Sequence, residues 1–341
     1  MCISGSLFLD GPAPEKFPGK SPLTKRSVSG KLTGTVYHIG KGCAIPIKKE
    51  EFFYPSADGV HQIHAVLWQP EGEVRGVVQL IHGICEYALR YEPFAAFLTS
   101  QGFAVCGSDH LGHGQSVTGP DEYGYFEKWE HLVKDVRTLR ERMGERFSGL
   151  PYFLLGHSMG SFVARTYLID YPGTVDGCLL SGTAYYSPSA AALGRAITSV
   201  GDPHKINKVF YAVSIGTYNR SVPDPRTAAD WICRDEAVVD AYLADPMCNF
   251  PTKGGMNHAM LTGLGRVADP RELQKMDKDT PVFFFAGDAD PVGAMGKGVR
   301  KVYGLFRTAG CRDVTVKFYA GGRHEMLNEL NKEQVYADCL A

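Results

Sequence analysis

The 341-residue chain has no excess of charge of either sign, because 36 Lys and Arg stand against 37 Asp and Glu. A formal net charge of −1 leaves no electrostatic footprint for nucleic-acid binding and no support for a strongly basic membrane-binding face. No apolar run is as long as a transmembrane helix requires. The first residues also lack a basic region ahead of an apolar stretch, so we predict no secretory signal peptide.

Cysteine is present, but not in the patterns that carry structure or metal. The chain has nine cysteines, an odd number, without a Cys-x-x-Cys pair or a histidine-rich partner segment. We therefore expect reduced thiols and a cytoplasmic protein, with no metal site. A Gly-x-Gly-x-x-Gly motif after the first strand is also missing, which disfavours a cofactor-dependent oxidoreductase, and we expect no cofactor.

Residues 1–45 differ in composition from the rest. They are rich in Gly, Pro, Ser and Lys and show little sustained periodicity. We expect this segment to be a poorly ordered N-terminal extension that plays no part in the fold.

From residue 48 onward, apolar β-rich runs alternate with segments of helical spacing. This alternation predicts an α/β protein with a doubly wound, mostly parallel sheet, formed by residues 46–182 and 270–341. The rhythm breaks over 183–269, which has the pattern of short helices and loops and predicts an inserted helical cap. The predicted strands are 63–70, 76–83, 103–109, 152–156, 177–182, 281–290 and 314–322, and the predicted helices are 91–102, 130–147, 161–172, 298–309 and a last one from about 332.

The stretch Gly-His-Ser-Met-Gly follows one of the predicted strands. Gly156 and Gly160 lie two residues to either side of Ser158, where larger side chains would collide across a tight strand-to-helix turn. Such a turn places a serine hydroxyl at its apex, as a nucleophile requires. The alternative is a small-residue turn whose serine only caps the next helix.

An acid and a histidine follow later strands, in the order serine, acid, histidine. We expect His324 to take the Ser158 proton and Asp290 to hold and charge-stabilise that imidazole. Asp288 competes for the acid role, and Asp290 is preferred because it lies further past the strand end. The backbone N–H groups of Met159 and Ile84 are the candidate oxyanion donors. Each residue also has a structural interpretation when it is considered alone. Asp290 fits a helix N-cap, because Pro291 follows it, and His324 fits an ordinary surface or core histidine.

Together these motifs resemble the monoacylglycerol lipase and lysophospholipase branch of the α/β-hydrolases. The resemblance rests on residues 79–91, 107–116, 154–161, 285–293 and 319–329, and residues 230–250 are similar to the cap of bacterial members. It implies an α/β-hydrolase fold, the triad Ser158, Asp290 and His324, and oxyanion amides at Ile84 and Met159. The chain departs from the family loop at Tyr87 and Ala88, where His and Ser are usual, which puts polar contacts at the substrate entrance in question.

The resulting expectation is a serine carboxylester hydrolase that cleaves single-chain lipid esters, either monoacylglycerol or lysophospholipid, through an acyl-enzyme on Ser158. Three alternatives stay open: a broad-specificity carboxylesterase, an acyltransferase, and a non-catalytic binding protein of the same fold. The serine disfavours a dehalogenase, which needs an aspartate there. We expect a lipid substrate, no nucleic-acid partner and, as an open option, transient contact of the cap with a membrane or micelle.

The apolar side chains of the cap have two interpretations that the sequence leaves open. They either line an acyl-chain pocket or pack the cap onto the sheet. We interpret His204 and His258 as ordinary cap residues and His113 as a structural loop residue. The apolar residues concerned are Leu193, Ile197, Val209, Phe210, Ile215, Leu261 and Leu264.

Overall fold

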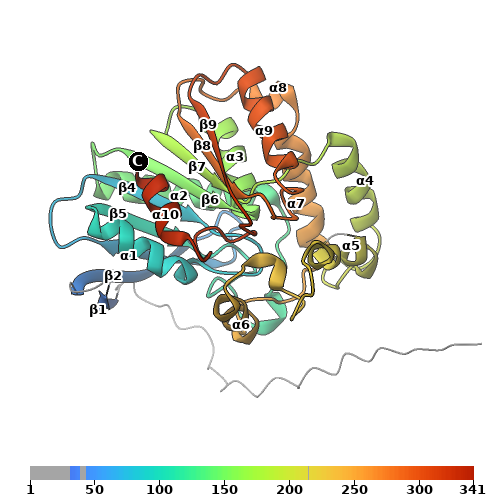
Figure 1. The fold of residues 1–341 in the computed structure, drawn as a ribbon, viewed down its shortest axis with the longest axis horizontal. Helices are drawn as coiled ribbons and strands as arrows, with labels where there is room; N and C mark the ends of the chain where they lie inside the picture. Colours follow the sequence, from blue (N-terminus) through green and yellow to red (C-terminus); the bar gives the residue numbers. More distant parts are fainter. Residues whose placement is uncertain (1–30, 39–43, 214) are drawn as a thin grey trace, which may run out of the picture.

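A nine-stranded sheet runs through the part of the chain that the structure, a computed structural model, describes: residues 31–38, 44–213 and 215–341 (Figure 1). The strand order is β1-β2-β3-β5-β4-β6-β7-β8-β9. Three neighbouring pairs are antiparallel: β1–β2, β2–β3 and β3–β5. The other five are parallel: β4–β5, β4–β6, β6–β7, β7–β8 and β8–β9. The strands are β1 (Lys31–His38), β2 (Ala44–Pro55), β3 (Gln62–Gln69), β4 (Gly76–Ile81), β5 (Phe103–Ser108), β6 (Tyr152–His157), β7 (Gly177–Ser181), β8 (Val282–Gly287) and β9 (Val314–Tyr319). The predicted doubly wound, mostly parallel sheet is confirmed.

The sheet begins earlier than the sequence analysis predicted. Most of the expected extension, 1–30 and 39–43, lies outside the described residues. Within it, however, β1 pairs antiparallel with β2, from Lys31 opposite Glu51 to His38 opposite Ala44. The expectation that all of 1–45 takes no part in the fold was therefore wrong for 31–38 and 44–45. The physical reason is that a ladder of main-chain hydrogen bonds stabilises a strand whose apolar alternation is weak.

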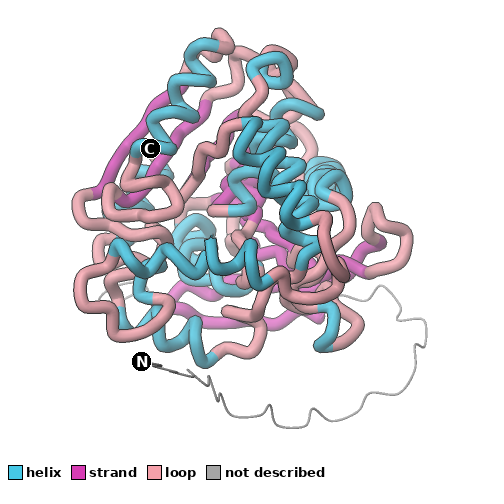
Figure 2. The backbone as a smooth tube through the Cα atoms, turned by 90° about the vertical axis from the view of Figure 1, so that its right-hand side faces the viewer, coloured by secondary structure: helices cyan, strands magenta, loops and turns pink. Residues whose placement is uncertain are grey.

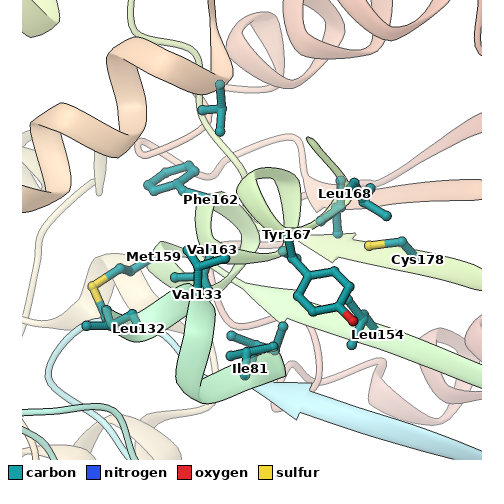
Figure 3. Packing of buried hydrophobic residues seen from close by; sticks show 14 of the residues in the cluster. Ile81, Leu132, Val133, Leu154, Met159, Phe162, Val163, Tyr167, Leu168 and Cys178 are labelled. Atoms are coloured by element: carbon teal, nitrogen blue, oxygen red, sulfur yellow. The ribbon is translucent and has the colours of Figure 1, made fainter. Parts of the chain in front are cut away.

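Helices cover both faces of the sheet, as Figure 1 shows. Helices α1 (Glu92–Ser100) and α10 (Lys332–Leu340) pack on one face, and α2 (Trp129–Arg146), α3 (Met159–Asp170) and α9 (Lys297–Thr308) pack on the other. Residues of β4 enter both cores, Val77 and Ile81 on one face and Val78 and Leu80 on the other, which explains why all of its residues but Gln79 are apolar or glycine. Figure 3 shows the second core, where Met159, Phe162 and Val163 of α3 meet Leu132 and Val133 of α2.

The segment between β7 and β8 forms helices and loops, with no strand among its described residues. It contains α4 (Pro188–Thr198), α5 (Lys208–Val213), α6 (Glu236–Ala244), α7 (Gly254–Val267), α8 (Pro270–Leu273) and the 3₁₀ turns η3 (Ile215–Ser221) and η4 (Asp230–Ile232). Helix α7 packs against both α4 and α3, and Figure 2 is viewed from the side of the molecule on which Figure 1 places α4 and α7. This is the segment for which we predict a cap, and the division at 183 and 269 stays a prediction.

In the described ranges, no helix combines the length and apolar character needed to cross a membrane.

Candidate active site

The turn between β6 and α3 carries Ser158 at its apex. Strand β6 ends at His157 and α3 begins at Met159, so a single residue reverses the chain. Ser158 has φ 51° and ψ −119°, a backbone conformation that costs a non-glycine residue on the order of 1–3 kcal/mol. Its N–H donates to the Ser181 carbonyl at 2.9 Å, which ties the strained residue to the end of the neighbouring strand. Ser158 is thus an apex residue and not a side-chain helix cap.

Both flanking glycines are required by the closeness of the backbone. A Cβ on Gly156 would lie 2.5 Å from the carbonyl oxygen of Gly160. A Cβ on Gly160 would overlap the Ile81 carbonyl oxygen and lie 2.5 Å from that of His82. Backbone atoms cannot yield to such contacts as a flexible side chain would, so the Gly-x-Ser-x-Gly spacing follows from packing.

The structure brings His324 and Asp290 together. His324 Nδ1 and Asp290 Oδ2 are 3.0 Å apart, and both residues are buried. The other carboxylate oxygen, Oδ1, accepts the Val292 N–H at 2.9 Å, which fixes the orientation of the carboxylate. Asp288 instead accepts the Gly321 N–H at 2.7 Å. Of the two candidate acids, the geometry favours Asp290, and with Nδ1–H engaged there, Nε2 is the nitrogen available to take a proton.

Ser158 and His324 each lie against the residues at the end of β7. A Cβ on Gly182 would lie 2.9 Å from Cε1 of His324, and the preceding residue, Ser181, accepts the Ser158 N–H. The described residues show no hydrogen bond between the Ser158 hydroxyl and His324. Such catalytic bonds are commonly long without substrate and tighten when it binds.

Two opposing effects set the pKa of His324. Burial lowers it, but the negative charge and hydrogen bond of Asp290 outweigh burial and raise the pKa above its usual value of 6.5. The neighbouring His157 has no such partner, and burial, followed by the charge of His324, lowers its pKa well below 6.5. Of these two adjacent imidazoles, only His324 is therefore stabilised as a cation.

The candidate oxyanion donors flank the serine. Met159 is the first residue of α3, so its N–H has no acceptor within the helix. Ile84 lies in the loop after β4, and this loop lies against Ser158, because a Cβ on Gly83 would be 3.0 Å from Ser158 Cβ. Glu86 holds the loop in shape by accepting the Gly83 N–H at 2.5 Å and the Tyr91 hydroxyl at 2.8 Å.

A buried ion-pair network that the sequence analysis did not predict joins this loop to the histidine. Arg90 contacts Glu86 at 2.8 Å and both carboxylate oxygens of Glu325, the residue after His324, at 2.9 Å. The only signal for it was that Glu86 and Arg90 fall within the family-like stretch 79–91. At the two departures from that stretch, the Tyr87 hydroxyl donates to Asp245 at 2.7 Å and the Ala88 N–H donates to Asp109 at 2.8 Å.

The apolar residues considered for an acyl pocket divide into three groups. Leu193 and Val209 are exposed, at 65% and 64%. Phe210, Leu261 and Leu264 are buried in the core that lies under α7, and Ile197 packs against it, so these residues serve packing. The side chain of Ile215 is outside the described part.

The remaining histidines of the sequence analysis have local partners. His204 stacks on Tyr125 with ring centroids 4.1 Å apart, and His258 Nδ1 lies 3.3 Å from the Thr198 hydroxyl. His113 is buried, and its Nδ1 lies 2.9 Å from the Leu111 carbonyl oxygen, as a structural loop residue would. Within the described ranges, no group of three or more potential ligands could hold a metal ion.

Comparison with known proteins yields consistent matches. The family model Hydrolase_4, described as serine aminopeptidase, S33, matches residues 72–331. The chain is 30% identical over 296 residues to the monoacylglycerol lipase of Mycolicibacterium smegmatis, and the match covers 85% of this chain and 95% of the lipase. It is also 30% identical over 277 residues to human monoglyceride lipase, covering 81% and 83% of the two chains.

Among solved structures, a thermostable carboxyl esterase from Bacillus coagulans, in complex with glycerol, superposes with a TM-score of 0.79. It is 28% identical, and the match covers 86% of this chain and 96% of the esterase. With the sheet order, the strained serine turn and these matches in agreement, the chain belongs to the Hydrolase_4 family of α/β-hydrolases, on its monoacylglycerol lipase-like branch.

Proposed function

We propose that the protein is a serine hydrolase that cleaves carboxylic esters of single-chain lipids, with monoacylglycerol as the first substrate to test. The observation that carries the proposal is the Asp290–His324 pair, held beside a serine strained at the apex of the β6–α3 turn. A buried carboxylate–imidazole pair next to a serine forced out of regular structure is the arrangement that general-base activation of a hydroxyl needs.

The proposed reaction has two halves. Ser158 Oγ forms a bond to the acyl carbon while its proton moves to Nε2 of His324, and the N–H groups of Ile84 and Met159 stabilise the oxyanion. The ester C–O bond then breaks, and the leaving alcohol takes that proton. Water next loses a proton to the same nitrogen, attacks the acyl carbon and releases the fatty acid, and the proton returns to Oγ.

The predicted cap, 183–269, supports a lipid substrate. Four of its large apolar side chains are exposed, and all fall between residues 193 and 209: Leu193, Val200, Ile206 and Val209. Exposed apolar groups gathered on one short segment suit transient contact with a membrane or micelle, from which a single-chain lipid would enter. We also propose a cytoplasmic location, which fits the seven free thiols of the described part.

A broader carboxylesterase is the second candidate, favoured by the similarity to the Bacillus coagulans carboxyl esterase. A lysophospholipase activity belongs to the first candidate and differs only in the headgroup. Turnover compared across acetyl, medium-chain and long-chain glycerol monoesters and lysophosphatidylcholine separates these options. Preference for medium or long chains supports the lipid assignment, whereas a flat or reversed profile leaves only the esterase.

The first test is Ser158→Ala. We expect ester turnover to fall roughly 10⁴- to 10⁶-fold and fluorophosphonate labelling to disappear, with the fold retained. Ser199→Ala, which changes an exposed serine at the end of α4, is the matched control and should keep both ester turnover and fluorophosphonate labelling. Persistent labelling of the Ser158 variant would overturn the mechanism.

A further inference from the structure

One aromatic side chain of the predicted cap reaches the candidate base. The indole of Trp231, in turn η4, lies with its centroid 5.2 Å from that of the His324 imidazole, at an interplanar angle of 41°. The His157 ring lies 4.7 Å from the same imidazole. His324 is thus enclosed by the Asp290 carboxylate, the His157 ring, the Trp231 ring and the backbone of Gly182.

We propose that Trp231 is a positioning residue for His324: it fixes the plane of the imidazole and stabilises the cation that forms when the Ser158 proton is taken. The inference rests on the proposed function for the role of His324 as base. It goes beyond that function because it makes a segment of the cap part of the proton-transfer machinery.

The contact between Trp231 and His324 is built into the backbone. The Glu325 N–H donates to the Ile232 carbonyl at 2.7 Å, so the residues following each ring are joined directly. The Arg323 guanidinium donates to the carbonyls of Asp230 at 2.6 Å and Cys233 at 3.0 Å. Residues 230–233 and the histidine loop therefore form one hydrogen-bonded unit.

A fully buried carboxylate strengthens this unit. Glu329 accepts the backbone N–H groups of Arg323 at 2.9 Å and Arg234 at 3.1 Å, and its other oxygen accepts the Arg234 side chain at 2.8 Å. The backbone N–H of Trp231 donates to Asn219 Oδ1 at 3.1 Å, and the centroid of the Tyr218 ring lies 5.0 Å from that of the indole. The backbone that carries Trp231 is consequently fixed by hydrogen bonds, and the indole has the His324 and Tyr218 rings as packing neighbours.

The electrostatic effect follows from the indole face. An aromatic face within about 6 Å of a cation attracts it, and indole does so most strongly of the aromatic side chains. The charged groups that act on His324 are Asp290, Glu325 and Glu86, all acidic, while His157 stays neutral through burial and the charge of His324. Trp231 adds a further stabilisation that comes from the cap and not from the sheet.

Fluorescence tests the contact without substrate. Protonated imidazole quenches indole emission, so the wild-type spectrum minus that of Trp231→Phe isolates Trp231 among the three tryptophans of the chain. We expect this difference signal to fall as pH falls, with the same midpoint as the acid limb of kcat/KM. The titration should vanish in a His324→Gln background, where Glu86, Glu325, Asp290 and His157 are all still present.

Kinetics tests the role. Trp231→Leu should lower kcat by roughly 3- to 30-fold with little change in KM, and move the acid-limb midpoint to lower pH. Trp231→Phe and Trp231→Tyr should retain most of the wild-type kcat, because each keeps an aromatic face next to His324. Phe250→Leu is the matched control, since the Phe250 ring lies at the same centroid distance, 5.2 Å, from His113, a histidine outside the proposed triad, and it should leave the midpoint unchanged.

The outcomes are distinguishable. A pH-independent difference signal, a titration that survives His324→Gln, or an unchanged midpoint in a folded Trp231→Leu protein would each overturn the inference. If Trp231→Leu fails to fold, the fluorescence titration of the wild type and Trp231→Phe still decides. Because that titration needs no ester, it stands even if the protein proves to hydrolyse none, in which case the proposed function fails and the contact remains.

Discussion

At the scale of single residues, Asp290 and Asp288 give the site its sharpest internal comparison. They lie two positions apart after the same strand. Asp290 pairs with the His324 imidazole, whereas Asp288 accepts a hydrogen bond from the Gly321 N–H. Because the Asp290 charge raises the pKa of His324, the proposed base is protonated, and so unable to accept a proton, over a wider acidic range than a free histidine would be. Ester turnover should therefore decline as pH falls through a midpoint above 6.5.

The substitution Asp290→Asn removes the charge that raises this pKa. We expect the acid-limb midpoint of kcat/KM to move down, and kcat to fall by on the order of 10⁴ because the imidazole loses its orientation and tautomer. Asp288→Asn is the control and should leave the midpoint in place. The pH dependence of kcat/KM for the wild type, Asp290→Asn and Asp288→Asn tests this prediction. Equal shifts of the acid-limb midpoint in both variants would contradict the assignment of Asp290 as the acid.

At the scale of elements, Arg165 joins both ends of the predicted cap to α3, the helix that follows Ser158. Its guanidinium donates to the Ala184 carbonyl at 3.0 Å, near the start of the segment, and to the Val267 carbonyl at 2.9 Å, near its end. The side chain is buried, and burial lowers its pKa to about 9. A buried cation bound to neutral carbonyls is costly, so it marks a contact on which the placement of the cap depends.

Replacing Arg165 by Met leaves both carbonyls buried without a donor. We expect the free energy of unfolding to fall by about 3 kcal/mol, and proteases to cut within 183–269 more readily. Denaturant unfolding and limited proteolysis measure these two effects. Arg271→Met, which changes an arginine that is 90% exposed at its side chain, should alter stability by less than about 0.5 kcal/mol. An Arg165 variant as stable and as resistant as the wild type would show that the cap ends are held by other contacts.

The sequence was informative wherever a local pattern has one physical cause. The glycines around Ser158 and the apolar runs of β4 and β6 are such patterns, and they predicted the serine turn and the parallel sheet. Strand β1 was missed because its stability comes from pairing with β2 and not from its own alternation. Arg165 and Trp231 were missed for a related reason. Arg165 binds the carbonyl of Val267, 102 residues away, and Trp231 packs on the ring of His324, which is also distant in the chain, so no spacing rule indicates either contact.

At the scale of the whole molecule, a buried histidine links the antiparallel and parallel halves of the sheet. His64 of β3 lies 2.9 Å from Asp109, after β5, and 3.2 Å from Glu51 of β2. Burial lowers its pKa, but the hydrogen bonds and charges of these two carboxylates outweigh burial and raise it to about 9. The folded protein therefore keeps this imidazole charged at neutral pH.

This linkage gives stability a defined dependence on pH. Because the folded pKa exceeds the unfolded value near 6.5, the contribution of His64 is fully present below 6.5 and is lost as pH rises through about 9. The stability difference between the wild type and His64→Gln should therefore be about 3 kcal/mol larger at pH 6 than at pH 10. Urea unfolding at the two pH values tests this, and a difference that does not change with pH would contradict a charged His64.

The proposed triad comes from parts of the chain that are far apart in sequence but lie along one end of the sheet: Ser158 follows β6, Asp290 follows β8 and His324 follows β9. A partly folded chain in which the last two strands had not yet docked would already possess the serine turn, but neither the acid nor the base. Ester cleavage thus appears only with the final tertiary contacts, whereas helix content can develop earlier. Recovery of turnover after dilution from denaturant would accordingly time the closing step of folding, and not its beginning.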